Sequence, residues 1–204
     1  MPSRLGPPAT EESPVSKPVL QIIIASTRPG RVGLPVAQWF EGVARAQGAF
    51  EVEVLDLAAV ALPLFDEPGH PIARQYEHPH SIAWSETIDR GDAFVLVHPE
   101  YNHSYNAALK NALDYLHTEW NYKPVGFVSY GGVSAGTRAQ AALKPVLGAL
   151  RMTPTVEAVN VPFVAQFIDD EGRFVPNDVL SMGAAGMLAE LARLDGALRP
   201  LRTA

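Results

Sequence analysis

The sequence predicts a three-layer α/β protein in which a five-stranded parallel sheet lies between two layers of helices. Short runs of apolar and β-branched residues alternate along the chain with longer segments whose apolar residues recur at helical spacing. Alternation of this kind is typical of parallel strands joined by crossover helices. The length of 204 residues fits one domain, and a domain of this size buries enough surface to fold without disulfides. We therefore expect one domain over residues 18–204.

Residues 1–17 differ from the rest of the chain. This segment is rich in Pro, Ser and Glu, and it has no apolar periodicity. Because it has too little apolar surface to offset the entropy of ordering it, we expect a flexible tail. It also lacks the apolar region of a secretory signal, which favours a cytoplasmic protein.

Five segments have the composition of strands. Residues 19–25 are almost continuously apolar, as expected of a strand that is buried on both faces. Residues 50–57 instead alternate apolar and acidic side chains over most of their length, which predicts a half-exposed strand at an edge of the sheet. The other three predicted strands are residues 93–98, 124–129 and 153–161.

The segments between the strands predict helices. The first lies between Gly33 and Gly48, because Leu34, Ala37 and Phe40 recur at helical spacing. The other predicted helices are residues 81–90, 106–116, 137–150 and 178–198. Residues 58–80 contain several prolines, so we expect an irregular connection there.

Composition excludes several classes of function. The chain has no cysteine, which rules out disulfides, thiolate-bound zinc, iron–sulfur clusters held by cysteine and a cysteine nucleophile. With 16 Lys and Arg against 22 Asp and Glu and no basic cluster, we expect no nucleic-acid partner. The longest apolar stretches are shorter than the ~18 residues of a membrane span, so we expect no membrane partner.

The first of three chemically unusual loops follows the first predicted strand. Residues 26–33 combine the hydroxyls of Ser26 and Thr27 with Arg28 and Arg31, just ahead of a helix. Helix N-termini and arginines both bind phosphate, so the loop predicts an anion site. It matches neither the P-loop nor the dinucleotide-binding glycine pattern. The alternative interpretation is an ordinary turn with exposed arginines.

The second loop is Pro99, Glu100, Tyr101 and Asn102, after the third predicted strand. Its aromatic ring offers a stacking surface, and its backbone groups are free to bind the edge of a planar heterocycle. The alternative is a turn in which Asn102 caps the helix that follows.

The third loop, residues 129–136, follows the fourth predicted strand and contains three glycines, which permit close backbone approach. The alternative is a mobile surface loop. Ligands of parallel sheets bind at the carboxyl ends of the strands, where all three loops meet. This convergence predicts a ligand site at that edge.

The histidines do not predict a metal site. His70, His78 and His80 lie in the Pro-rich connection at spacings that match no known metal motif. His98 ends a predicted strand, so we place it nearer the ligand edge.

Four segments of the chain resemble the NADPH-dependent FMN reductase family. They are Ser26-Thr27-Arg28 with Arg31, P-E-Y-N at 99–102, L-K-N-A-L-D at 109–114, and the glycines and Arg-Ala of 131–139. The resemblance covers roughly residues 19–161. It implies a flavodoxin-like fold with strand order 2-1-3-4-5. It also implies an FMN-dependent oxidoreductase that passes hydride from NADPH or NADH, through bound FMN, to a small acceptor such as a quinone, an azo compound, a metal oxyanion or free flavin.

The resemblance also implies roles for individual residues. Ser26, Arg28, Arg31 and the backbone of Val32 and Gly33 would hold the FMN phosphate. The residues that would line the flavin ring and ribityl chain are Pro99, Glu100, Tyr101, Asn102, Ser129, Tyr130, Gly131 and Gly132. No catalytic side chain is required, because the chemistry takes place at flavin N5.

Three features of the sequence have alternative interpretations. Many family members have Pro-Gly where this chain has Asn106-Ala107, which leaves the start of the following helix open. The family implies a homodimer or homotetramer, and Trp84, Tyr115 and Trp120 suit either that interface or the core. The alternative function is a non-catalytic FMN electron carrier or a redox-sensing partner of another protein.

Overall fold

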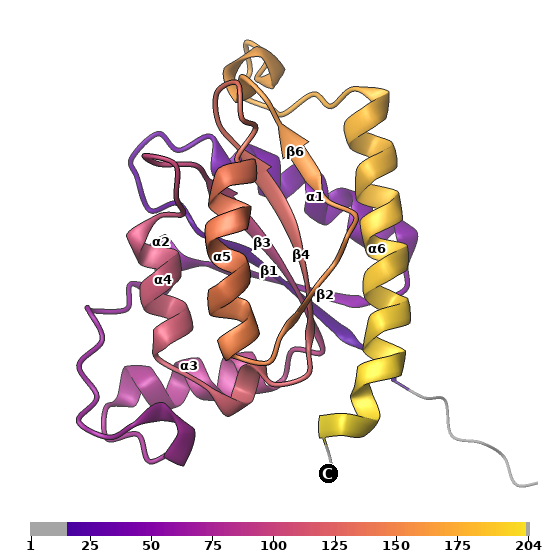
Figure 1. The fold of residues 1–204 in the computed structure, drawn as a ribbon. Helices are drawn as coiled ribbons and strands as arrows, with labels where there is room; N and C mark the ends of the chain where they lie inside the picture. The colour runs from indigo at the N-terminus through magenta and orange to yellow at the C-terminus, as the bar shows by residue number, and fades with distance from the viewer. Residues whose placement is uncertain (1–15, 203–204) are drawn as a thin grey trace, which may run out of the picture.

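The computed structural model describes residues 16–202, and Figure 1 shows a central sheet with helices on both faces. The strands are β1 (Val19–Ile24), β2 (Glu51–Asp56), β3 (Ala93–Pro99), β4 (Pro124–Tyr130), β5 (Thr153–Pro154) and β6 (Val159–Val161). All pairings are parallel, in the order β2-β1-β3-β4-β5, with β6 also paired to β4. The predicted fold and strand order are confirmed. Ser16 and Lys17 are exposed, and the remainder of the predicted tail lies outside the described residues.

The prediction of one continuous strand over residues 153–161 is wrong. β5 and β6 pair with the two ends of β4, and the chain leaves the sheet between them. There the N–H groups of Val156 and Glu157 donate to the Glu190 carboxylate, at 3.0 and 2.9 Å, instead of to a neighbouring strand. Since these donors are satisfied outside the sheet, the ladder breaks without leaving them unpaired.

The five predicted helices are present. The helices are α1 (Gly33–Gln47), α2 (Leu57–Val60), α3 (Pro79–Asp89), α4 (Ala107–Asp114), α5 (Thr137–Ala149) and α6 (Asp178–Leu198), with short 3₁₀ turns at Pro71–Ala73, Thr118–Trp120, Val164–Phe167 and Arg199–Arg202. The turn α2 and the turn at Pro71–Ala73 lie in the segment predicted to be irregular. Asp56 accounts for α2, because its carboxylate accepts the N–H of Ala58 at 3.0 Å and caps the turn.

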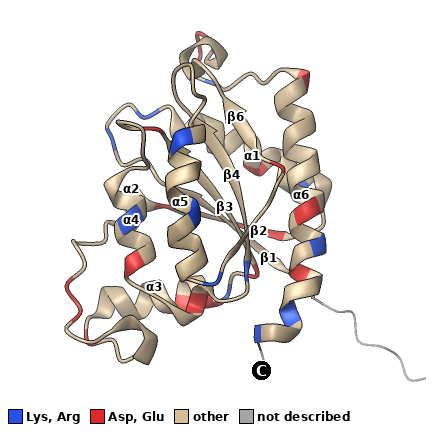
Figure 2. Ribbon diagram, viewed as in Figure 1, with Lys and Arg blue, Asp and Glu red and all other residues tan. Residues whose placement is uncertain are grey.

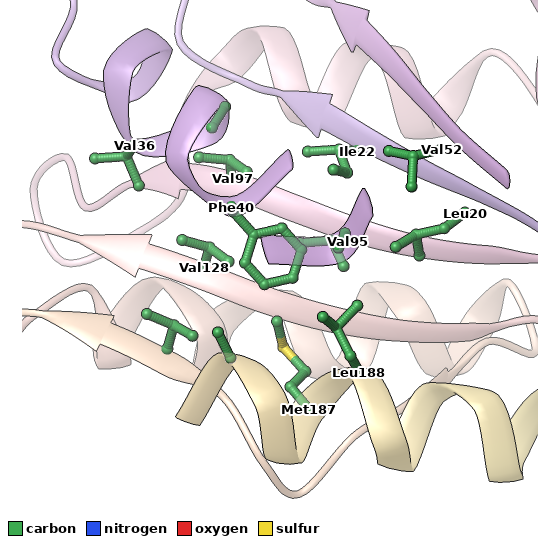
Figure 3. Close-up of a cluster of buried hydrophobic side chains, with 14 of the residues drawn as sticks. Leu20, Ile22, Val36, Phe40, Val52, Val95, Val97, Val128, Met187 and Leu188 are labelled. Atoms are coloured by element: carbon green, nitrogen blue, oxygen red, sulfur yellow. The ribbon is translucent and has the colours of Figure 1, made fainter. Parts of the chain in front are cut away.

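One face of the sheet is covered by α1 and α6. Figure 3 shows Phe40 of α1 and Met187 and Leu188 of α6 against strand residues such as Val95 and Val128. All five side chains are fully buried. Burial of a large apolar side chain contributes about 1.5–3 kcal/mol to the free energy of unfolding, so this cluster fixes both helices on the sheet.

The opposite face is covered by α3, α4 and α5. Trp84, Tyr115 and Trp120 are buried here within the single chain, at 2%, 0% and 0% exposure. The indole N–H groups of both tryptophans donate to backbone carbonyls of α4, at 2.9 and 3.2 Å. These aromatic residues therefore belong to the core and are not available for a subunit interface.

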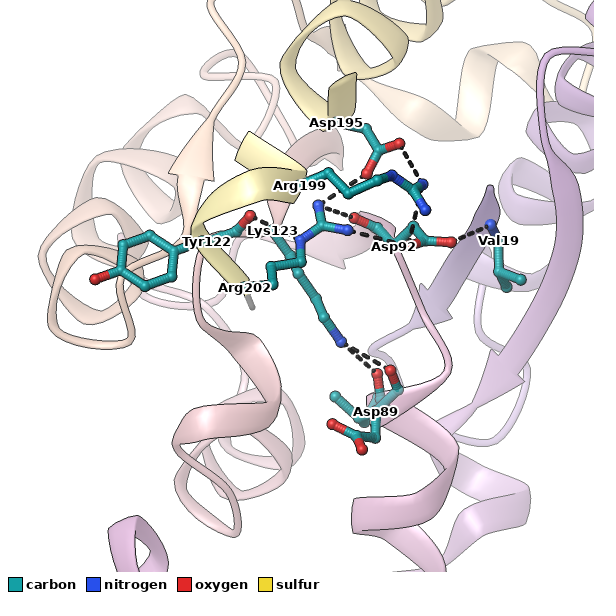
Figure 4. Close-up of polar contacts among 9 residues, drawn as sticks. Val19, Asp89, Asp92, Tyr122, Lys123, Asp195, Arg199 and Arg202 are labelled. Atoms are coloured by element: carbon teal, nitrogen blue, oxygen red, sulfur yellow. Dashed lines mark hydrogen bonds and ion pairs between the residues drawn. The ribbon is translucent and has the colours of Figure 1, made fainter. Parts of the chain in front are cut away.

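A polar cluster anchors the C-terminal segment at the amino ends of the strands (Figure 4). The Asp92 carboxylate accepts the N–H of Val19 at 2.8 Å and pairs with Arg202 at 3.0 Å. Arg202 and Arg199 also pair with Asp195 of α6, at 2.8 and 2.7 Å. The cluster ties α6 to the sheet at the edge opposite the three loops.

The charged residues of α6 lie at its first residue and in its C-terminal half, where both signs occur, as Figure 2 shows. Within residues 16–202, no helix combines the length and the apolar character that crossing a membrane requires.

Candidate functional site

The three loops converge on one cleft of about 460 Å³ at the carboxyl ends of β1, β3 and β4. Its lining consists of Ser26, Arg28, Pro29, Gly30, Arg31, Val32, Pro99, Glu100, Tyr101, Tyr130, Gly131, Gly132 and Val164. Three residues of the predicted site, Gly33, Asn102 and Ser129, do not line it. The sheet order explains the convergence, because β1 and β4 both neighbour β3.

The first loop leads into the N-terminus of α1, where Gly33 and Leu34 carry backbone N–H donors and Pro35 carries none. Helix α1 begins at Gly33, Val32 is its N-cap without a side-chain hydrogen bond, and the first turn contains no acidic residue. The first N–H groups of a helix have no partner within the helix, and its dipole favours negative charge there. Beside them, the buried Ser26 hydroxyl lies 3.3 Å from the Tyr101 hydroxyl. This corner of the cleft is suited to an anion.

The two arginines of this loop differ in their partners. Arg31 forms an ion pair with Asp56, at the end of the neighbouring strand β2. Arg28 is exposed, and its guanidinium lies over the Tyr101 ring, 5.7 Å from the centroid. Among the described residues, no carboxylate pairs with Arg28. A ligand in the cleft would therefore meet the positive charge of Arg28, which no neighbouring carboxylate of residues 16–202 neutralises.

The second loop contains a tight hairpin. Tyr101 and Ser104 exchange two backbone hydrogen bonds of 2.8 and 2.9 Å. Asn102 and His103 between them have φ of 50° and 65°, the sign that a type I′ turn requires at both positions. Asn102 is thus exposed at the tip of a turn, and the interpretation of Asn102 as a helix cap is wrong.

Asn106 occupies the N-cap position of α4, although its side chain makes no capping hydrogen bond to the helix. Its side-chain Nδ2 donates to the carbonyl of Ala25 at 2.7 Å, and the helix begins at the next residue. This contact joins the start of α4 to the end of β1, so the helix start is defined although Pro-Gly is absent.

Glu100 connects the second loop to the third. Its carboxylate accepts the backbone N–H of Arg138 and pairs with the Arg138 guanidinium, both at 3.2 Å. Burial raises the pKa of the Glu100 carboxyl, but hydrogen bonds from Ser134 and Arg138 outweigh this effect and hold the pKa below its usual value. Glu100 therefore remains ionised and fixes the start of α5 against the cleft.

Hydrogen bonds of Ser129 hold the third loop in place. Ser129 is fully buried, and its hydroxyl donates to the Ala135 carbonyl at 2.7 Å and accepts from Gln140 at 2.8 Å. Gly136 has φ of +85°, and a methyl group there would lie 2.6 Å from the Ser129 Cβ. These contacts hold the loop so that the backbone of Gly131 and Gly132 faces the cleft.

Tyr130 points toward α1. A methyl group at Gly33 would lie 2.4 Å from the Tyr130 hydroxyl, so Gly33 makes room for the ring. The hydroxyl is buried, and no described group meets it with ordinary hydrogen-bond geometry. Burial, together with the neighbouring Tyr101, raises the pKa of this hydroxyl well above its usual value, and the Ser26 hydroxyl and the positive charges of Arg31 and Arg28 oppose the rise only in part.

Sequence reasoning missed some of these residues. Val164 lines the cleft because it follows β6, whose carboxyl end lies at the same edge. The sequence offered one signal for Val164, because it follows the end of the fifth predicted strand and ligands bind at the carboxyl ends of strands. The hydrogen bonds that Gln140 and Glu100 make across the third loop had no local signal, because each joins separate elements. In the described part of the chain, no group of three metal-ligating side chains comes together.

His98 lies beneath the cleft, not in it. The side chain is fully buried on β3, and burial lowers its pKa to about 4, partly opposed by a hydrogen bond with the Pro99 carbonyl and by Glu100. The unfolded chain binds a proton at the ordinary pKa near 6.5, whereas the folded protein does not until about 4. Acid therefore favours the unfolded state across this window.

We expect the free energy of unfolding to fall by up to about 3 kcal/mol as the pH drops from 6.5 to 4 because of this one group. Chemical denaturation of His98→Leu should show a shallower pH dependence over that range. The control is His103→Asn, which changes an exposed histidine in the hairpin turn. Equal pH slopes in wild type and His98→Leu would contradict the assignment.

The chain is similar to proteins of one family over most of its length. The model of the NADPH-dependent FMN reductase family matches residues 19–166. An NAD(P)H-dependent FMN reductase of Schizosaccharomyces pombe is 41% identical over 149 residues, which cover 71% of this chain and 74% of the relative. An NADPH azoreductase of a Bacillus species is 36% identical over 88 residues, or 43% of this chain and 47% of the azoreductase.

The fold has a counterpart among solved structures. A flavoenzyme NAD(P)H:(acceptor) oxidoreductase of Paracoccus denitrificans superposes with a TM-score of 0.70 at 19% identity, over 89% of this chain and 98% of the other. At that identity the likeness concerns the fold alone.

Proposed function

The chain belongs to the NADPH-dependent FMN reductase family, and from that premise we propose that its three-loop cleft binds FMN and that the protein oxidises NADPH or NADH. Bound FMN supplies the redox chemistry, by accepting hydride from the nicotinamide and passing electrons to an acceptor. The observation that carries the proposal is the meeting of an anion-binding corner and a glycine-lined wall in one cleft.

The phosphate of FMN fits the first loop. The free N–H groups at the start of α1, the Ser26 hydroxyl and the uncompensated charge of Arg28 form a donor set for a phosphate dianion. Arg31 Nε is buried and has no partner among the described residues, which leaves a further donor beside this corner. We assign these groups, with the backbone of Val32 and Gly33, to the phosphate.

The flavin ring fits the space between the second and third loops. Pro99, Glu100 and Tyr101 form one side, and Tyr130, Gly131 and Gly132 form the other. A methyl group at Gly132 would meet no atom within 4 Å, so the backbone there is bare toward the cleft. Bare backbone permits a planar ring to approach closely and to accept N–H bonds. Asn102 and Ser129 are next in sequence to residues of these two sides, and their contacts with the flavin remain predictions.

The acceptor is a small molecule. The azoreductase named above supports an azo compound as one acceptor, and the resemblance to the family adds quinones, metal oxyanions and free flavin. The reductase names of the relatives support an enzyme over an electron carrier.

The test is a visible spectrum of the purified protein with FMN, recorded without oxygen before and after NADPH or NADH. We expect bound flavin absorbance that bleaches with either nucleotide and returns with a quinone or an azo dye. Protein that binds no FMN would overturn the proposal. If the flavin bleaches only when a separate reductase is added, the protein is a non-catalytic FMN electron carrier.

We also propose that the protein forms a homodimer or homotetramer through the segment after β2. Four apolar side chains of residues 64–82 are exposed, at 81% for Leu64, 38% for Phe65, 55% for Ile72 and 42% for Ile82. These four side chains come from one short stretch of the sequence, and exposed apolar side chains that form a contiguous patch are typical of subunit contacts.

Light scattering should therefore give a mass of two or four chains, and Leu64→Glu should lower it. Val179→Glu is the control, because Val179 is 76% exposed at the start of α6. A wild-type protein of single-chain mass, or a Leu64→Glu variant with unchanged mass, would contradict this surface.

A further inference from the structure

We propose that Tyr130 recognises the phosphate of FMN rather than its ring: its hydroxyl donates a hydrogen bond to a phosphate oxygen and thereby favours FMN over riboflavin. The inference rests on the proposed function and assigns this residue to a different part of the ligand from the one its position in the glycine loop implies.

The Tyr130 side chain points away from the loop that carries its backbone. Tyr130 ends β4, and its backbone belongs to the wall assigned to the ring. Its ring, however, packs in the core cluster beneath α1 and α6, and its hydroxyl reaches the first residue of α1. The hydroxyl therefore lies beside the anion-binding corner, although the residue comes from the third loop.

The Tyr130 hydroxyl lacks a well-formed hydrogen bond among the described residues. The hydroxyl is buried, and the Ser26 hydroxyl, which acts on it as a hydrogen-bonding neighbour, does not meet it with ordinary hydrogen-bond geometry, nor does any other described group. A buried hydroxyl without a well-formed hydrogen bond is unfavourable, and few side chains in native proteins are left so. Ser26, Arg28 and Arg31 are its polar neighbours, and all three line the same cleft. A phosphate oxygen held by these groups would complete the hydrogen bonding of Tyr130.

Gly33 makes room for the Tyr130 hydroxyl at the start of α1. A side chain at this position would displace the hydroxyl, because a methyl group there would lie 2.4 Å from it but 3.1 Å from the ring carbon that carries it. Because Gly33 has no side chain, the Tyr130 hydroxyl can lie next to the backbone N–H groups at the start of α1. The Tyr130 hydroxyl and the helix N–H groups can therefore donate hydrogen bonds to the same anion, which stabilises the anion at this place.

The experiment compares Tyr130→Phe with wild type, using FMN and riboflavin as separate probes. Dissociation constants are measured by quenching of flavin fluorescence. We expect FMN binding to weaken about tenfold or more, as for a hydrogen bond to a charged group, and riboflavin binding to stay unchanged. Tyr122→Phe is the control, because the Tyr122 hydroxyl bonds with Arg151 far from the cleft.

A second measurement separates binding from packing. The thermal midpoint of the flavin-free Tyr130→Phe protein should equal or exceed that of wild type, because the change removes an unpaired buried hydroxyl and keeps the ring. Inorganic phosphate should raise the midpoint of wild type more than that of the variant.

The outcomes are distinct. Equal weakening of FMN and riboflavin, or unchanged FMN binding by Tyr130→Phe, would overturn the role of Tyr130 and leave the FMN site standing. Failure of wild type to bind FMN would overturn the proposed function itself. In a double-variant cycle, Gly33→Ala should cost less FMN affinity in the Tyr130→Phe background than in wild type, since the closest contact is gone. Equal costs in both backgrounds would count against the pairing.

Discussion

Replacing Gly136 by alanine is expected to lower the free energy of unfolding by about 3 kcal/mol or more, because backbone strain and overpacking act together. The residue has φ of +85°, a region that side chains rarely adopt. A methyl group there would also lie 2.6 Å from the Ser129 Cβ and 2.9 Å from the Tyr130 backbone nitrogen. The second of these atoms is backbone of β4 and cannot move without disturbing the sheet.

The same change should weaken FMN binding. The added methyl group would push against Ser129 and Tyr130, which precede Gly131 and Gly132 in the chain. Relief of this clash would therefore displace the backbone of Gly131 and Gly132, which lines the cleft. Urea denaturation measures the first effect and fluorescence titration with FMN the second. The control is Gly148→Ala near the end of α5, where a methyl group meets nothing within 4 Å. That change should stabilise the helix by about 0.5–1 kcal/mol. A Gly136→Ala protein as stable as wild type would show that the loop has another conformation.

Replacing Arg28 by alanine is expected to weaken FMN binding by about 10- to 100-fold, the range for loss of a charge-assisted hydrogen bond. Arg28 is the cleft arginine without a carboxylate partner among the described residues, whereas Arg31 is paired with Asp56. Removal of Arg28 therefore takes away uncompensated positive charge and leaves no buried carboxylate unpaired. Riboflavin, which lacks the phosphate, should bind the variant and wild type alike.

Titrations at two salt concentrations sharpen this test. The affinity of wild type for FMN should fall with added salt, and the affinity of Arg28→Ala should fall less, because screening weakens exposed charges. Arg193→Ala removes an exposed arginine from α6 and controls for net charge. Unchanged FMN affinity in Arg28→Ala would remove Arg28 from the phosphate site.

Much of the fold was predictable from local patterns. β1, β3 and β4 are buried on both faces and read as apolar runs, whereas β2 carries acidic residues because it lies at the edge. The error in the fifth strand has a non-local cause. Glu190, some thirty residues further along the chain, takes the N–H groups that the strand would have used.

The candidate site was predictable in its loops but not in its contacts. The order of strands brings residues 26, 100 and 130 to one edge, and loop chemistry at strand ends signals such an edge. The type I′ turn at Asn102 was the exception, because its residues suit a helix cap equally well in sequence.

The sequence by itself determined the alternation of strands and helices, the absence of thiol chemistry and the three loops that meet at one edge. These follow from composition and spacing, which act locally along the chain. Only the tertiary structure decided which polar groups are left for a ligand. Arg31 is neutralised because β2 lies beside β1, and the Tyr130 hydroxyl is buried beside Gly33, where none of the described groups meets it with ordinary hydrogen-bond geometry. Both results depend on contacts between residues far apart in sequence, and no local pattern encodes them.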